Sequence, residues 1–335
     1  MLEKVDAWLE RRATGIRDAR RRSFVFIHLW DVHYDYIPPP EYIEIFDPGY
    51  DGTLDGRDFL DNPRIRPDMP ARDLQHLLAL YDAEIRYTDD TIARLLELFD
   101  AHDMLNRSAI LVTADHGEEF FEHGGIGHGF TLHEEVLRVP MILWLPGLRP
   151  ARSTSERVAS LIDVAPTVCE LFAADCGYDG LGESLLPDYL EQSPAASRQD
   201  ALAEITNSHI GLDLTARIDS AGAILSDNRS GRLTYGPARR PGAPGSSFSV
   251  NAKRLDRYPE AVRRSVDQMR KRSARARREG ARIRRGEKTE QQPIDPRTLE
   301  QLEALGYLGR EAGEGERGPV AQPDTTTSSA PGEPR

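Results

Sequence analysis

The sequence has little cysteine and no long apolar run. Its two cysteines, Cys169 and Cys176, lie seven positions apart without a CxxC or Cys/His pattern, so the spacing indicates neither a disulfide framework nor a structural zinc site. No stretch of about 18 apolar residues is present, which argues against a transmembrane helix in this chain. Residues 1–22 are charged and amphipathic, unlike a secretory signal peptide. These patterns leave the redox compartment and the localisation open.

Basic residues are too few to balance the acidic ones. The 335 residues include 43 Lys and Arg against 55 Asp and Glu, a formal net charge of -12, which argues against a nucleic-acid partner. Residues 253–288 are an exception, with 15 Lys and Arg against 5 Asp and Glu. This stretch predicts a helix that either contacts an anionic polymer or membrane surface, or is a solvated helix of an acidic protein. Its sparse apolar positions favour the second interpretation.

Apolar patterning predicts alternating strands and helices in the first half of the chain. Three short apolar runs are typical of buried parallel strands: residues 24–30, 109–114 and 139–145. Residues 72–102 keep one apolar helical face throughout, and a further helix begins near Asp163 with Pro166 in its first turn. This order predicts an α/β domain whose mostly parallel central sheet is flanked by helices.

The rest of the chain is weaker in pattern. Alternating segments in residues 201–235 predict a small antiparallel sheet. We expect four parts: an α/β core (1–180), a small C-terminal α+β subdomain with a linker (181–250), a basic helical extension (251–310) and a disordered tail (311–335).

The segment TADHGE, residues 113–118, carries the strongest chemical signal. It places Asp115 and His116 side by side where a predicted strand ends, and ligand sites in open α/β sheets lie at strand ends. A carboxylate oxygen and an imidazole nitrogen suit a divalent cation, and Gly117 lets the backbone turn beside it. Two ligands are too few to hold an ion, so others must come from elsewhere. In the alternative interpretation, Asp115 caps a loop and His116 is a surface residue.

Residues 113–140, TADHGEEFFEHGGIGHGFTLHEEVLRVP, resemble over their whole length the second signature region of bacterial sulfatases, which belong to the alkaline-phosphatase superfamily. Four more segments resemble that family in the same order: residues 28–36 with the prolines that follow, 80–90, 161–168 and 295–308. Five ordered matches are far more specific than one motif. The resemblance implies an alkaline-phosphatase-like sandwich and the hydrolysis of sulfate esters, of carbohydrates or aryl alcohols, at a divalent-metal site.

The resemblance also implies roles for single residues. Asp115 and His116 would be two ligands of the ion, with calcium favoured and magnesium or manganese as alternatives. His33 would face the sulfate ester and protonate or hydrogen-bond the leaving oxygen. His128 lies where many members have a cationic sulfate-binding residue, often Lys. A neutral loop histidine is the alternative for His128, and it is the favoured interpretation for His123.

Two elements of the family pattern are missing from the sequence. There is no Cys-x-Pro-x-Arg or Ser-x-Pro-x-Arg segment, whose first residue becomes the formylglycine nucleophile, and no N-terminal pair of metal-binding aspartates. The pair Asp89 and Asp90 falls inside the predicted long helix, where a solvated helix face explains it better. In family members both elements precede the part that Met1 begins.

We therefore expect an N-terminally truncated sulfatase-like chain that carries half of a site and is inactive alone. Its sheet would expose an apolar edge, and an N-terminal segment or a companion chain would complete it. Two alternatives stay open. One is a phosphodiesterase or phosphoglycerol transferase of the same superfamily, and the other is a non-catalytic remnant that binds anions or partners, so whether the chain is an enzyme is undecided.

Overall fold

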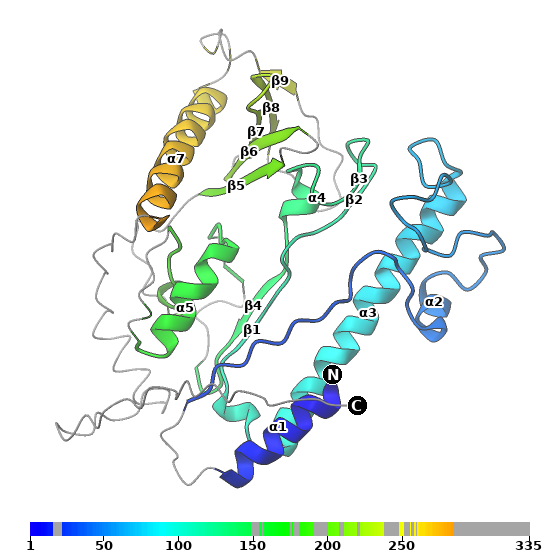
Figure 1. Cartoon of the computed structure of the whole chain (residues 1–335), viewed down its shortest axis with the longest axis vertical. Coiled ribbons are helices and arrows are strands. Elements are labelled where there is room, and N and C mark those ends of the chain that lie inside the picture. The colour runs from blue at the N-terminus through cyan, green and yellow to red at the C-terminus, as the bar shows by residue number, and fades with distance from the viewer. Residues whose placement is uncertain are drawn as a thin grey trace, which may run out of the picture.

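A computed structural model gives the arrangement of the predicted elements. It describes residues 1–15, 22–148, 154–155, 157–174, 176, 181–190, 200–207, 211–219, 222–237, 248–250, 255, 258 and 260–284. The predicted helix at 295–308 and tail at 311–335 lie outside these residues. A mixed α/β region is followed by an antiparallel sheet with one helix against it (Figure 1). Among the helices described here, none is long and apolar enough to cross a bilayer.

The predicted long helix is confirmed as α3 (Ala71–Ala101), which runs diagonally through Figure 1. Its apolar face places Leu77 and Leu80 in a core with Tyr36, Phe59 and Phe120. Helix α1 (Leu2–Gly15) packs against α3, as does α2 (Pro40–Phe46), which has a proline in its first turn. The short 3-10 helix η1 (Leu105–Arg107) follows α3. Val32 and Tyr34, on either side of His33, pack against this core.

The strands predicted at 109–114 and 139–145 are confirmed in place as β1 (Ile110–Thr113) and β4 (Met141–Trp144). Their predicted parallel arrangement is wrong, because β1 and β4 pair antiparallel. The chain between them leaves and returns at the same end of the ladder, with Thr113 opposite Met141, as in a hairpin. That excursion contains the two-residue strands β2 (Glu119–Phe120) and β3 (Ile126–Gly127) and the helix α4 (Glu134–Leu137). Across the described parts of the chain, every strand pairing is antiparallel.

The strand predicted at residues 24–30 is not formed, which corrects the sequence analysis. This segment is an unpaired coil in Figure 1, and the side chains of Phe24, Phe26 and Trp30 are largely exposed, 78% for Phe26. An apolar sequence is not enough for a strand, because the backbone also needs hydrogen-bond partners on a neighbouring strand. With Ile142 of β4 also exposed, this part of the molecule presents apolar surface to water.

The antiparallel sheet predicted near residues 201–235 is confirmed and is larger than expected. It orders β5 (Asp200–Asn207), β6 (Leu212–Asp219), β7 (Gly222–Asp227), β8 (Arg232–Pro237) and β9 (Phe248–Val250) in sequence. The predicted basic helix is α7 (Glu260–Arg284), seen beside the sheet in Figure 1. Its few apolar residues, Val262, Val266 and Met269, form one buried stripe against Ile224 and Leu233. The helix is thus a half-buried element with a solvated basic face.

The helix predicted near Asp163 is confirmed as α5 (Val164–Leu171), preceded by the 3-10 helix η2 (Leu161–Asp163) and followed by α6 (Leu186–Tyr189). The buried carboxylate of Asp163 accepts hydrogen bonds from the backbone N–H groups of Ser160 and Glu183. One expectation is corrected here, because Cys169 and Cys176 form a disulfide. The chain turns back after α5 and brings their Cα atoms to 5.8 Å, a separation that no spacing motif reveals.

Candidate functional site

The turn after β1 positions Asp115 and His116 and depends on Gly117. The Gly117 N–H donates to the Val136 carbonyl at 2.7 Å, which holds the turn against α4. A Cβ atom at position 117 would lie 2.1 Å from the Glu135 carbonyl oxygen, so any larger residue would push the two segments apart. The glycine of the TADHGE segment is therefore required by a close backbone approach.

Asp115 and His116 have the chemistry of two ligands of one ion. The Asp115 side chain is 78% exposed, and its Oδ2 lies 3.7 Å from His116 Nε2. His116 Nδ1 lies 2.9 Å from the Gly117 carbonyl oxygen, which can only accept, so Nδ1 carries the proton and Nε2 keeps a lone pair. One oxygen and one nitrogen, close together and available, fit a divalent cation that takes its other ligands elsewhere.

The structure brings all four predicted site residues together. The His128 ring stacks on the His116 ring with centroids 3.8 Å apart, and its centroid lies 5.4 Å from that of His33. His33 comes from the coil before α2, whereas the other three follow β1. His33 Nδ1 is hydrogen-bonded to the carbonyl oxygen of Tyr34, which leaves its Nε2 for other contacts. Residues more than 80 positions apart in the chain thus form one cluster of imidazoles beside a carboxylate.

Glu118 belongs to this cluster and was missed by the sequence analysis. Its buried carboxylate accepts hydrogen bonds from the Tyr36 hydroxyl and from His128 Nδ1, the latter at 3.0 Å. Burial, and then the Glu118 charge, raise the pKa of Tyr36, so this phenol stays protonated and donates. The Glu118 carboxylate thus fixes the orientation of the His128 ring through Nδ1. The available signal was a glutamate directly after the Asp-His-Gly turn.

Glu84 is a second residue that the sequence analysis missed. It lies on the apolar face of α3, is 3% exposed, and accepts a hydrogen bond at 2.8 Å from the N–H of Ile37. Its Oε2 atom has no hydrogen-bond partner among the described residues. Burial is the main reason that the pKa of Glu84 is raised to about 7, with the Asp31 charge adding to it and the backbone N–H groups of Ile37 and His33 opposing it. A glutamate on an apolar helical stripe was the sequence signal.

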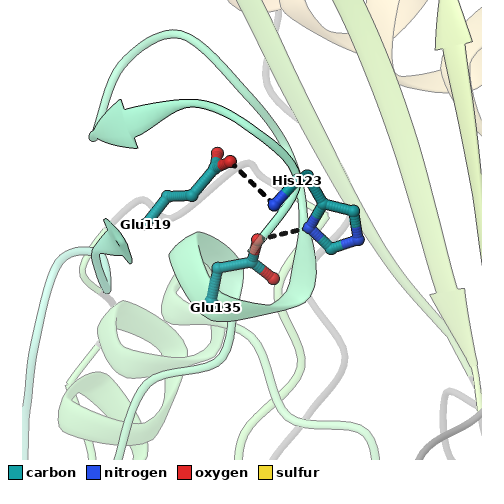
Figure 2. Close-up of side chains that lie close together, drawn as sticks. All are labelled: Glu119, His123 and Glu135. Carbon is teal, nitrogen blue, oxygen red and sulfur yellow. Dashed lines mark hydrogen bonds and ion pairs between the residues drawn. The ribbon is translucent and has the colours of Figure 1, made fainter. Parts of the chain in front are cut away.

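A separate cluster of metal-ligating side chains lies on the same excursion of the chain. Figure 2 shows Glu119, His123 and Glu135 pointing toward one another, with one ligand atom from each lying within 4.8 Å of the others. His123 Nδ1 donates to Glu135 at 2.6 Å. His123 lies in the turn between β2 and β3, and its ring is paired with Glu135 there.

Comparisons with known proteins identify the family. The family model described as Sulfatase matches residues 1–174. Arylsulfatase K of Gallus gallus is 30% identical over 122 residues, which cover 36% of this chain and 22% of that protein. The chain thus matches about a fifth of this relative's length.

Two solved structures are similar in fold. A protein in complex with its substrate D-glucosamine-2-N,6-O-disulfate gives a TM-score of 0.57 at 15% identity, covering 82% of this chain and 70% of that one. The phosphonate monoester hydrolase of Agrobacterium radiobacter gives 0.55 at 18% identity, covering 74% and 53%. At these identities the similarity is one of fold, and this chain shares a mixed α/β architecture with both proteins. Because the family model covers more than half of its residues, the chain belongs to the sulfatase family.

Proposed function

We propose that this chain carries part of the divalent-metal site of a sulfuric ester hydrolase. The observation that supports the proposal is the single cluster formed by Asp115, His116, His128 and His33. Asp115 and His116 would hold the ion, with calcium first and magnesium or manganese as alternatives. Bound there, the cation would stabilise negative charge on the sulfate oxygens.

The remaining residues of the cluster would act on the ester itself. His128, held through Nδ1 by Glu118, is oriented to bind a sulfate oxygen with its other ring nitrogen. His33, held through Nδ1 by the Tyr34 carbonyl, would hold the proton that the leaving oxygen takes up. In each imidazole one nitrogen is fixed by the protein and the other is left for the substrate, an arrangement that sets ring orientation as well as proton position.

The nucleophile is the component that this sequence does not contain. No Cys-x-Pro-x-Arg or Ser-x-Pro-x-Arg segment and no N-terminal aspartate pair is present. We propose that a further segment or a companion chain supplies both, and that these 335 residues alone do not turn over substrate, because covalent catalysis needs its nucleophile. The exposed apolar side chains of Phe24 and Phe26 mark a surface that such a segment would cover.

The proposed substrate is a carbohydrate sulfate, on the analogy of the similar structure solved with a glucosamine disulfate. An ester of phosphonic or phosphoric acid is the second candidate, favoured by the similar fold of a phosphonate monoester hydrolase. Both chemistries would use the same metal site.

Paired activity assays test the proposal. The chain is assayed alone and together with the nucleophile-bearing N-terminal segment of a sulfatase, on glucosamine 6-sulfate, p-nitrophenyl sulfate and phenyl phosphonate esters. We expect sulfate release only from the complemented pair, lost with Asp115→Asn and kept with the control Glu134→Gln, a partly exposed residue of α4. Turnover by the chain alone, abolished by His33→Ala, would contradict the missing nucleophile. A complemented pair that hydrolyses only phosphonate esters would contradict the sulfatase assignment of the site.

A further inference from the structure

The cluster of Glu119, His123 and Glu135 lies on the opposite side of the β2–β3 hairpin from the candidate active site. Successive side chains of an extended chain point to opposite faces. Glu118 therefore faces Tyr36 and His128, whereas Glu119 faces the turn of the hairpin and α4. The two adjacent glutamates serve different clusters, and the second one is not part of the site built around Asp115.

The Glu119 carboxylate is held rigidly in place. It is 1% exposed, and it accepts hydrogen bonds from the N–H groups of Gly125 at 2.8 Å and His123 at 3.2 Å and from the Thr131 hydroxyl at 3.0 Å. The two N–H groups donate to Oε1 and the hydroxyl to Oε2, so the direction of the carboxylate is fixed and Oε2 keeps one lone pair for a further partner. Hydrogen bonds of this kind to a ligand carboxylate are typical of the surroundings of protein metal sites.

The charges of the cluster favour a cation. The His123 ring and the Glu135 carboxylate are 19% and 13% exposed, and Glu119 is fully covered. Across the described part of the chain, no Lys or Arg forms an ion pair with either glutamate, and the ring of His133 stacks on that of His123 with centroids 3.7 Å apart. Two covered carboxylates thus face the His123 imidazole, and uncompensated charge in a covered site is costly.

We propose that Glu119, His123 and Glu135 bind a divalent transition-metal ion, with Zn²⁺ the best fit. One imidazole nitrogen and two carboxylate oxygens are ligands that zinc accepts, whereas calcium is bound almost wholly through oxygen. The ligand atoms, within 4.8 Å of one another, need only small rotations to reach the separation of roughly 3.3 Å that tetrahedral bonds of about 2.0 Å imply. Water completes the coordination. The ion takes the place of the proton between His123 and Glu135, so its affinity falls at low pH.

Such an ion ties together the ends of the loop that carries His128. Glu119 lies on β2, His123 in the hairpin turn and Glu135 on α4, and His128 falls between the second and third ligands. On the other side, His128 is hydrogen-bonded to Glu118 and stacks on His116, so the ion would fix the loop that presents that histidine to them. The site is structural and acts on the loop, separately from the ion at Asp115.

Calorimetric titration of the full chain with Zn²⁺ tests the inference. Asp115→Asn removes the other site, and in this background we expect one zinc ion to bind, with a rise in Tm on zinc addition. His123→Gln should lower the affinity by at least ~100-fold, because even an outer-shell partner is typically worth about 10- to 100-fold. Glu135→Gln should do the same. The control Glu134→Gln, at a partly exposed neighbour paired with Arg138, should leave the affinity unchanged.

Two readouts keep the result interpretable. The Co²⁺ form of the Asp115→Asn protein should show visible absorption bands of a low-coordinate site that disappear with His123→Gln. The Tm of each variant in EDTA tells whether it still folds. If His123→Gln does not fold, Glu135→Gln decides the outcome. A failure of the Asp115→Asn protein to bind zinc, or zinc binding that survives both substitutions, would overturn the inference.

Discussion

Replacing the buried Glu84 by Gln should change how the stability of the protein depends on pH. The carboxyl group is 3% exposed on α3, and burial raises its pKa from 4.5 to about 7. Glutamine keeps an oxygen that can accept the hydrogen bond of Ile37 N–H, but it does not titrate. The substitution thus removes one proton-binding site while leaving the main contact of that side chain in place.

The sign and size of the effect follow from the two pKa values. Between pH 4.5 and 7 the folded protein holds the Glu84 proton more tightly than the unfolded chain, so the free energy of unfolding falls as the pH rises through this range. At about 1.4 kcal/mol per pH unit, the difference corresponds to roughly 3 kcal/mol, which partial solvent screening reduces. From pH 5 to pH 8, we expect the free energy of unfolding of Glu84→Gln to rise by roughly 2 kcal/mol relative to that of the wild type.

Urea unfolding at a series of pH values, followed by tryptophan fluorescence, measures the effect. The control is Glu97→Gln, because Glu97 is an exposed glutamate of the same helix. We expect the difference in unfolding free energy between Glu84→Gln and the wild type to grow with pH, and that of the control to stay flat. Parallel pH profiles for Glu84→Gln and the wild type would refute the buried-carboxyl explanation, whatever the absolute stability of the variant.

Two other predictions concern the candidate metal site and the exposed apolar surface. The chain alone should bind calcium weakly, since Asp115 and His116 supply only part of a shell of six to eight ligands, and Asp115→Ala should abolish binding in calorimetry; tight binding that survives the substitution would place the ion elsewhere. The isolated chain should associate through Phe24 and Phe26, which size-exclusion chromatography with light scattering detects. Phe26→Ser should reduce the association, and a monodisperse wild-type monomer would contradict it.

Local sequence patterns predicted where helices and strands lie better than they predicted which strands pair. The one-sided apolar pattern of α3 and the apolar runs of β1 and β4 are properties of the segments themselves, and they were located correctly. The antiparallel pairing of β1 with β4 depends on where the excursion between them returns, and the coil at residues 24–30 depends on the presence of a neighbouring strand. Both conditions depend on other parts of the chain, so the sequence of the segment itself does not reveal them.

For the candidate site too, local sequence features revealed some residues and not others. Asp115 and His116 are neighbours in sequence, so their juxtaposition was evident, and the family resemblance singled out His33 and His128. Glu84 and Glu118 were missed because their importance lies in contacts with residues far away in the chain, 47 positions for Ile37 and 82 for Tyr36. A buried carboxyl on an apolar stripe is the one local signal that could have found Glu84.

The position of His128 depends on the alternation of two adjacent glutamates. Glu118 reaches His128 and Tyr36 on one side of β2, while Glu119 accepts three hydrogen bonds from the hairpin turn and Thr131 on the other. A shift of one residue that brought Glu118 to the place of Glu119 would bring Gly117 to the place of Glu118, and His128 would lose its carboxylate partner. The contacts that bury Glu119 therefore also fix the register of the strand, which places Glu118 against His128 and Tyr36. The loop is thus anchored on both sides, and the orientation of His128 is set by the backbone before any substrate arrives.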